Sequence, residues 1–321
     1  MNAAAWPEHE AIARPPVVRR ALAVLVPEAV RQAAEVLAPR GIPVMPLKGA
    51  VAQHWLYGDP SERLATDADL LVTPEAFEPA LACLRAAGFG WRGEVRGQGQ
   101  AVLLAPCGVA VDLHAFPLGP WRFPGCSARR LFERARLDRD LFGVPVWLPH
   151  PEDFVLHLVG KLVLDRVGPG ERLGRWTELA EAPLRLGLSA DGVASRADRL
   201  GLQRALRYVA RAVLVRGHQV VGGGSATRSW WRRLSWTMGA DPMGDLLATG
   251  MAHARPGPTR VLAAYALEDT APSAVWRLLR RLGAEHGRVT GRMWRRSMNA
   301  RASRGIRQDV GVSRRRAGEP R

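Results

Sequence analysis

Two aspartates separated by one residue form the clearest chemical pattern in the chain. Asp67 and Asp69 stand directly before the apolar residues 70–72. Alternate side chains of a β-strand point to the same face, so both carboxylates are expected on one side. Like charges this close repel and raise a carboxyl pKa, and a hard cation such as Mg²⁺ relieves the repulsion. The spacing indicates a divalent-cation site, although the pair alone also fits a solvated strand end beside a turn.

A third carboxylate lies on a later segment with strand character, VAVDLHAF at 109–116. Asp112 and His114 share one face of that expected strand. A sheet that places this strand beside the strand of Asp67 and Asp69 would bring Asp112 toward both. We interpret His114 first as a structural histidine, with a role near a metal or an acceptor as the alternative.

A candidate phosphate-binding turn precedes the aspartates. The short apolar segment IPVMPL at 42–47 is typical of a strand, and Gly49 is expected to open a helix that ends near Tyr57. The first backbone N–H groups and the positive dipole end of such a helix lie at the turn and suit phosphate. Lys48 would add a side-chain cation there, or would be a surface residue at the helix start.

The elements that must position these residues follow from periodicity and punctuation. Apolar spacing in 16–40 predicts two helices broken at Pro27, and Gly41 is placed as a C-cap. Thr73, Pro74 and Glu75 are a typical helix start. The remaining expected elements of this part are a helix ending at Gly88, strands at 89–95 and 101–106, a helix at 127–135 and an edge strand at 143–149.

Beyond Pro151 the apolar spacing becomes wholly helical. Short tryptophan-bearing helices are expected at 226–249 and a last amphipathic helix at 273–283. The fold class is therefore α+β, with a small mixed sheet flanked by helices and then an all-α domain. The predicted divisions are N-terminal helices at 1–40, the sheet domain at 41–150, the helical domain at 151–286 and a basic, disordered tail at 287–321.

The charge of the chain is unevenly distributed. The net charge is +16, and residues 255–321 hold 16 arginines against five acidic residues, or +11 of that total. Such a basic segment could bind RNA or an anionic membrane, or be a solvated tail. No apolar run is long enough to span a bilayer and no leader-like segment is evident, so we expect a cytoplasmic protein. The three cysteines are widely spaced and fit a reducing compartment.

Taken in order, these segments resemble a known family. Leu47-Lys48-Gly49, Tyr57, Arg63 four residues before Asp67-Ala68-Asp69-Leu70-Leu71-Val72, and the later Val111-Asp112-Leu113-His114 resemble the uncharacterised nucleotidyltransferase family of the polymerase-β-like superfamily. The resemblance covers about residues 40–180. The helical half is similar only loosely, through the stretch RWTEL at 175–179.

The resemblance implies a nucleotidyltransferase domain that binds a nucleoside triphosphate with two Mg²⁺ ions. Asp67, Asp69 and Asp112 would be the catalytic, metal-ligating carboxylates, with Asp112 helping to deprotonate the acceptor. Lys48 and Gly49 would contact the phosphates. Arg63 would steady the triphosphate or brace the aspartate strand, for instance by pairing with Asp67 or Glu62.

The implied activity is transfer of a nucleoside monophosphate, with AMP from ATP as the favoured donor, to a hydroxyl of a small molecule or protein. One alternative keeps the enzyme and makes RNA the acceptor, bound through the basic C-terminal region. Another is a catalytically silent module that binds nucleotide or nucleic acid. The acceptor, the oligomeric state and the choice between nucleotidyl and phosphoryl transfer do not follow from the sequence.

Overall fold

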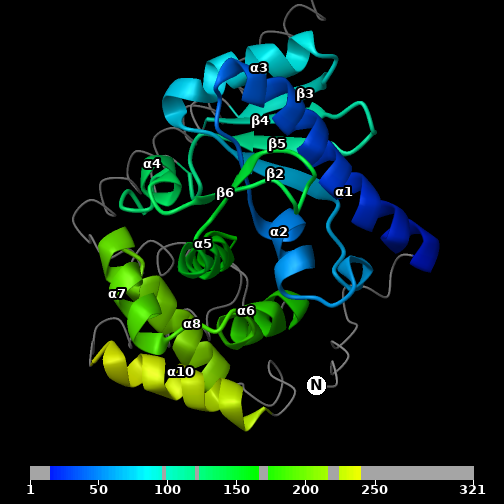
Figure 1. Cartoon of the computed structure of the whole chain (residues 1–321). Coiled ribbons are helices and arrows are strands. Elements are labelled where there is room, and N and C mark those ends of the chain that lie inside the picture. Colours follow the sequence, from blue (N-terminus) through cyan, green and yellow to red (C-terminus); the bar gives the residue numbers. More distant parts are fainter. Residues whose placement is uncertain (1–14, 96–98, 120–122, 166–172, 216–223, 240–321) are drawn as a thin grey trace, which may run out of the picture. The chain divides into compact units, whose positions relative to one another are not determined.

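The computed structural model describes residues 15–95, 99–119, 123–165, 173–215 and 224–239. These residues form an α+β structure in which a small mixed sheet with flanking helices is followed by a helical region (Figure 1). The predicted fold class is confirmed. The helix expected at 273–283 and the tail at 287–321 lie outside the described residues, and the predicted division into domains stays a prediction.

The main sheet has five strands in the spatial order β1-β2-β5-β4-β3. Only β2 and β5 run parallel, and the other neighbours are antiparallel. The expected strand at 42–47 is reduced to two residues, while the other four strands lie where the sequence places them. The bounds are β1 Met45–Pro46, β2 Asp67–Leu71, β3 Gly90–Val95, β4 Gln100–Leu104 and β5 Ala110–His114.

The two faces of this sheet belong to different hydrophobic cores. Alternate residues of β2 and β5, such as Ala68, Leu70, Val111 and Leu113, are buried in the core that includes residues of helices α1 (Pro16–Leu37) and α3 (Phe77–Ala86). Leu71, on the opposite face of β2, belongs to the core of the helical region. The polar residues of β2 and β5 therefore lie on the face turned away from α1 and α3.

Helix α1 is continuous, so the predicted break at Pro27 is wrong. A proline inside a helix removes one backbone hydrogen bond. In α1 a stripe of apolar residues runs on past that position and is fully buried, and this packing holds the helix together. The stripe consists of Val26, Ala29, Val30, Ala33, Ala34 and Leu37. Gly41 has a left-handed φ of 67° after the short 3₁₀ turn that follows α1, as a C-cap glycine does.

A second, two-stranded sheet joins β6 (Arg136–Asp138) to β7 (Val146–Leu148). The expected edge strand at 143–149 is thus present, but its partner β6 was not predicted. Helix α4 spans only Ala128–Phe132, so the helix expected at 127–135 is too long at its C-terminal end. The backbone N–H of Trp147 donates to the carbonyl of Val44 at 2.9 Å, which places β7 beside the entry to β1.

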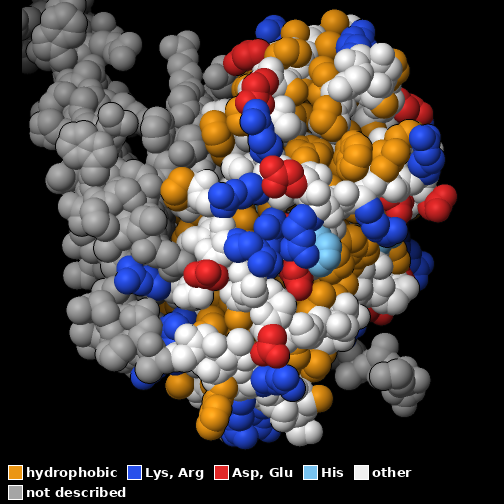
Figure 2. Space-filling model, turned by 60° about the vertical axis from the view of Figure 1, so that its left-hand side comes forward, with side chains coloured by type: hydrophobic (Ala, Val, Ile, Leu, Met, Phe, Trp, Pro, Cys, Tyr) orange, Lys and Arg blue, Asp and Glu red, His pale blue; other side chains and the backbone are white. Residues whose placement is uncertain are grey.

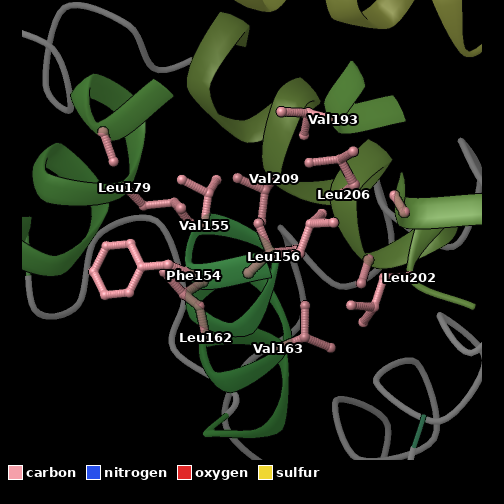
Figure 3. Packing of buried hydrophobic residues seen from close by; sticks show 14 of the residues in the cluster. Phe154, Val155, Leu156, Leu162, Val163, Leu179, Val193, Leu202, Leu206 and Val209 are labelled. Atoms are coloured by element: carbon pink, nitrogen blue, oxygen red, sulfur yellow. The ribbon is translucent and has the colours of Figure 1, made fainter. Parts of the chain in front are cut away.

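The helical region packs around α5 (Pro151–Leu164). Figure 3 shows Phe154, Val155 and Leu156 of α5 beside apolar residues of its neighbouring helices, including Leu179 and Val209. Residues 225–237 form one helix, and residues 240–249 of the predicted 226–249 segment lie outside the described residues. The further helices are α6 (Leu173–Arg185), α7 (Ala190–Leu200), α8 (Gln203–Val215) and α10 (Ser225–Thr237). None of the described helices is both long and apolar enough to cross a bilayer.

Arginines of the described residues are tied into ion pairs across elements. Arg129 of α4 lies 3.1 Å from Glu75, and Arg196 of α7 lies 2.5 Å from Asp153 of α5. Figure 2 shows one face of the molecule, on which Lys and Arg side chains lie in small groups with Asp and Glu between them. The described surface on this side is mixed in charge, unlike the segment 255–321 of the sequence.

Candidate active site

The two aspartate-bearing strands are neighbours in the sheet. Strand β2 pairs in parallel with β5, and the register sets Asp69 directly opposite Asp112 and Asp67 opposite Ala110. The expectation that the strand of Asp112 lies beside the strand of Asp67 and Asp69 is confirmed. Because these are parallel strands in register, the side chains of Asp69 and Asp112 leave the sheet on the same face.

The surroundings of the three aspartates differ. Asp69 is 3% exposed, whereas Asp67 and Asp112 are half-buried. The hydroxyl of Thr66 donates to Asp67 Oδ1 at 3.5 Å, and the amide of Gln100 donates to Asp112 Oδ2 at 3.3 Å. Asp69 is therefore the buried centre of the group, with one carboxylate beside it on the next strand and one earlier on its own strand.

His114 joins the aspartates. Its Nε2 donates to Asp69 Oδ1 at 3.0 Å and lies 4.0 Å from Asp112 Oδ2. The first interpretation of His114 as a purely structural residue leaves out this position between two carboxylates. The signal was present in the sequence, because His114 follows Asp112 at the i, i+2 spacing that puts both on one face of β5.

Lys48 reaches the same carboxylate from helix α2 (Lys48–Trp55). Its ammonium forms an ion pair with Asp69 Oδ1. The backbone N–H of Leu47 donates to the carbonyl of Asp69 at 2.9 Å, so the start of α2 is fixed to β2. Lys48 also has a left-handed φ of 48°, which is uncommon for a residue with a Cβ. The local backbone thus aims the lysine at Asp69.

Gly49 has a packing reason for lacking a side chain. A Cβ added at this position would lie 2.8 Å from the Cβ of Ala65, closer than real Cβ contacts allow. Gly49 is fully buried, and Ala65 belongs to the segment between Arg63 and β2. The glycine therefore lets that segment lie against the first turn of α2. Its predicted contact with phosphate stays a prediction.

Arg63 connects the approach to β2 with the helical region. Its Nε–H donates to Glu178 Oε2 of α6 at 2.6 Å, and its Nη1 donates to the carbonyl of Leu64 at 2.6 Å. The hydroxyl of Tyr57 donates to the same Glu178 oxygen at 3.0 Å. The expectation of a bracing role named Asp67 or Glu62 as the partner and missed Glu178. Glu178 lies in the RWTEL stretch, and that loose resemblance was the available signal.

Helix α5 contributes the buried His157 near the site. His157 is 1% exposed, and its Nε2–H donates to the carbonyl of Pro117, three residues after His114, at 3.0 Å. Burial, together with the positive charges of Lys48 and Lys161, lowers the pKa of His157 to about 3. The histidine is thus neutral, and it fixes the chain that leaves β5. Lys161 forms an ion pair with Asp165 at 3.2 Å.

The carboxyl groups titrate in opposite directions. Burial raises the pKa of Asp67, and the nearby charge of Asp69 raises it further. Burial alone would also raise the pKa of Asp69, but the hydrogen bond from His114 and the charge of Lys48 outweigh it and lower that pKa well below its usual range. The site therefore holds one firmly ionised carboxylate and one whose ionisation would be favoured by additional positive charge.

The donor set fits a divalent cation. Asp69, Asp112 and His114 each offer one ligand atom, and these three atoms lie within 4.8 Å of one another. Carboxylates are preferred ligands of Mg²⁺ and Mn²⁺, and an imidazole nitrogen is accepted more readily by transition metals than by Mg²⁺. The structure thus brings together two of the three predicted metal ligands, Asp69 and Asp112, and adds His114. Asp67 stands at the edge of this group.

Comparison with known proteins gives a family match. A family model described as uncharacterised nucleotidyltransferase matches residues 18–214, which include nearly all of α1 and most of the helical region. The match is thus longer than the resemblance at 40–180. No curated protein matched the chain.

Two solved structures are similar at low identity. One is the antibiotic-resistance factor ANT(2'')-Ia, with 16% identity, a TM-score of 0.39, and coverage of 60% of this chain and 96% of that one. The other is an antigenic nucleotidyltransferase-like protein from Paracoccidioides brasiliensis, with 19% identity, a TM-score of 0.38, and coverage of 66% and 92%. At this level of similarity, neither structure bears on the chemistry of the site.

Proposed function

The chain belongs to the uncharacterised nucleotidyltransferase family, and from this premise we propose that it transfers a nucleoside monophosphate to a hydroxyl group. The favoured donor is ATP, which would give AMP transfer, and the favoured acceptor is a small molecule or a protein. The observation that carries the proposal is the pairing of Asp69 with Asp112 on neighbouring parallel strands, with His114 beside both.

Asp69 and Asp112 would hold the divalent cation, and Asp67 would complete the site when a second ion binds. Mg²⁺, when bound, neutralises charge on the triphosphate and favours the ionised form of the acceptor hydroxyl. The raised pKa of Asp67 supports this assignment. Burial and the charge of Asp69 disfavour the ionised form of Asp67, and a neighbouring cation would stabilise that form.

In this reaction the protein mainly positions the triphosphate and the acceptor, and it forms no covalent bond to either. The acceptor oxygen forms a bond to the α-phosphorus, the bond from that phosphorus to the bridging oxygen breaks, and pyrophosphate leaves. Asp112 is half-buried and accepts a hydrogen bond from Gln100 at 3.3 Å, and in this proposal it takes the hydroxyl proton.

Lys48 and the first turn of α2 would receive the phosphates. The ammonium of Lys48 pairs with Asp69, and the start of a helix such as α2 presents backbone N–H groups that suit phosphate. Arg63 we assign to bracing, because its guanidinium is engaged by Glu178 at 2.6 Å. Gly49 would serve the same end indirectly, by letting the segment of Arg63 and Ala65 pack on α2.

The test compares ATP labelled in the α-phosphate with ATP labelled in the γ-phosphate, each incubated with the protein, Mg²⁺ and a cell extract. Nucleotidyl transfer labels an acceptor from the α-position only, and phosphoryl transfer labels it from the γ-position only. Asp69→Asn should abolish labelling of the acceptor. The control is Glu75→Gln, which lies in an exposed ion pair just before α3, and it should label the acceptor as wild type does. No α-labelled acceptor, or equal labelling by Asp69→Asn, would remove the proposal.

The assay also addresses the alternatives. RNase treatment of the labelled product reports whether the acceptor is RNA. Release of pyrophosphate that depends on Asp69 rules out a catalytically silent module. The basic segment 255–321 lies outside the described residues, so its role in RNA binding stays a prediction.

A further inference from the structure

Lys48 is paired with the carboxylate that a metal ion would need. Its ammonium pairs with Asp69 Oδ1, and the same oxygen accepts the hydrogen bond of His114 at 3.0 Å. Asp69 is also one of three residues, with Asp112 and His114, whose ligand atoms lie within 4.8 Å of one another. Asp69 is 3% exposed, so water contributes little to its solvation and the lysine is its main counter-ion.

The position of Lys48 is built into the backbone. The residue keeps a left-handed φ of 48° although it has a side chain, a conformation that persists only where the surroundings enforce it. On one side, the N–H of Leu47 is bound to the carbonyl of Asp69 at 2.9 Å. On the other side, Gly49 is packed against Ala65 without room for a Cβ. The contact of Lys48 with Asp69 is therefore fixed by the backbone of the turn and is not a chance pair on the surface.

An ammonium and a divalent cation compete for the same carboxylate. Both are positive, so placing them together on Asp69 is repulsive, and the metal gains less from the site while Lys48 remains there. A triphosphate offers Lys48 another anionic partner within reach of the same turn. Lysine suits such an exchange because its charge is compact and its four-carbon stem is flexible. The chain contains only two lysines beside 44 arginines.

We propose that Lys48 couples the metal to the nucleotide by holding Asp69 until a triphosphate draws it away. The proposal rests on the proposed function and describes how the same site is loaded. Its consequence is that the metal alone binds weakly and the metal–nucleotide complex binds well. Lys48 weakens binding of the metal alone by occupying Asp69, and it strengthens binding of the complex by pairing with the phosphates. Because coupling between two ligands is reciprocal, the metal raises the affinity for the nucleotide by the same factor as the nucleotide raises the affinity for the metal.

The experiment measures two affinities of the full chain. Free Mn²⁺ is counted by electron paramagnetic resonance during a titration without nucleotide. Binding of a Mn²⁺ complex with an ATP analogue that has a methylene between the α- and β-phosphorus is measured separately by calorimetry. For Lys48→Met we expect Mn²⁺ alone to bind about tenfold more tightly and the Mn²⁺–analogue complex to bind about tenfold more weakly, as for an ordinary coupling between sites.

Two further variants keep the result interpretable. Lys48→Arg retains the positive charge and should keep the weak binding of Mn²⁺ alone, which shows that charge and not the fold is responsible. Lys161→Met removes the only other lysine, which pairs with Asp165, and should leave the affinity for Mn²⁺ alone unchanged. Circular dichroism confirms that each variant is folded.

The outcomes separate this inference from the proposed function. If wild type and Lys48→Met bind Mn²⁺ with equal affinity, or if both affinities fall together in Lys48→Met, the coupling role is wrong while the metal site stands. If neither protein binds Mn²⁺ and Asp69→Asn changes nothing, the metal site itself is wrong, and both proposals are overturned.

Discussion

Arg63 and Glu178 are 115 residues apart in the sequence, yet the Arg63 Nε–H donates to Glu178 Oε2 at 2.6 Å. The side chains are 20% and 5% exposed, so the pair is largely withdrawn from water. Tyr57 adds its hydroxyl to the same carboxylate, and burial, followed by the charge of Glu178, raises the pKa of that hydroxyl. Glu178 of α6 therefore holds both Arg63, in the segment before β2, and Tyr57, in the segment after α2.

Removing this acid should be costly. In Glu178→Ala the guanidinium of Arg63 and the hydroxyl of Tyr57 lose a buried acceptor, and breaking a buried ion pair of this kind costs about 3 kcal/mol. We expect urea unfolding to show a loss of that size. The control is Glu181→Ala, one turn away on α6, whose pair with Arg185 is more exposed, and it should cost less than about 1 kcal/mol.

A double-mutant cycle makes the test specific to the pair. Arg63→Ala with Glu178→Ala should cost clearly less than the two single changes added together, by about 1–3 kcal/mol, as expected for residues in contact. Additive losses would mean that Glu178 stabilises α6 for some other reason than its pair with Arg63.

The packing of Gly49 on Ala65 gives a second prediction. Gly49→Ala would put two Cβ atoms 2.8 Å apart, and overpacking of this kind costs about 1–3 kcal/mol. Ala65→Gly removes the opposing Cβ, so the double variant should recover most of the loss in thermal unfolding. Gly58, just after α2, has nothing within 4 Å of an added Cβ, and Gly58→Ala should be close to neutral. If Ala65→Gly gives no recovery, the role of Gly49 lies outside packing.

The sequence predicted which strands carry the carboxylates of the site better than it predicted the contacts that these residues make. Asp69 and Asp112 follow from strand periodicity, because an i, i+2 pattern and two apolar strands suffice to put carboxylates on one face. That the two strands are neighbours depends on sheet order, which periodicity does not contain. The sequence left this neighbouring of the strands as a condition, and the structure supplied both the strand order and the register of Asp69 opposite Asp112.

Ion pairs between distant segments could not be predicted from the sequence. Nothing in the spacing around Arg63 indicates a partner on α6, since ion pairs between distant segments leave no local period. The break predicted at Pro27 was wrong for a related reason. The local helix propensity of proline favours a break, but burial of the apolar stripe from Val26 to Leu37 stabilises one continuous helix. The strand β6 was missed because three residues are too few to show alternation.

The pair of Asp153 with Arg196 ties α5 to α7 and gives a third prediction. Asp153 is fully buried, and Arg196 donates to it at 2.5 and 3.0 Å. Asp153→Asn leaves the guanidinium without a counter-charge, so we expect a loss of about 3 kcal/mol in the free energy of unfolding. The control Glu75→Gln weakens the exposed contact with Arg129, where the side chains are 73% and 65% exposed for arginine and glutamate, and should leave the free energy of unfolding almost unchanged. Equal losses would contradict the role given to burial.

His157 should make the protein sensitive to acid. Burial and the charges of Lys48 and Lys161 lower its pKa from 6.5 to about 3 in the folded state. Between these values the unfolded chain binds a proton at His157 that the folded protein does not, so stability falls as the pH drops from about 6.5 toward 3. The slope from one such group is at most about 1.4 kcal/mol per pH unit. Above pH 7 both states carry a neutral histidine and the contribution vanishes.

The variant His157→Gln removes the titration and keeps an amide donor for the carbonyl of Pro117, which accepts from His157 at 3.0 Å. Urea unfolding of wild type and variant is compared at pH 8, 6, 5 and 4.5. At pH 8 the difference reports packing alone. Below pH 6 the variant should gain on wild type by about 1 kcal/mol per pH unit, because only wild type must keep a histidine neutral. A difference that stays constant across this range would show that His157 is protonated equally in both states, and one that grows in favour of wild type would mean that its imidazolium stabilises the fold.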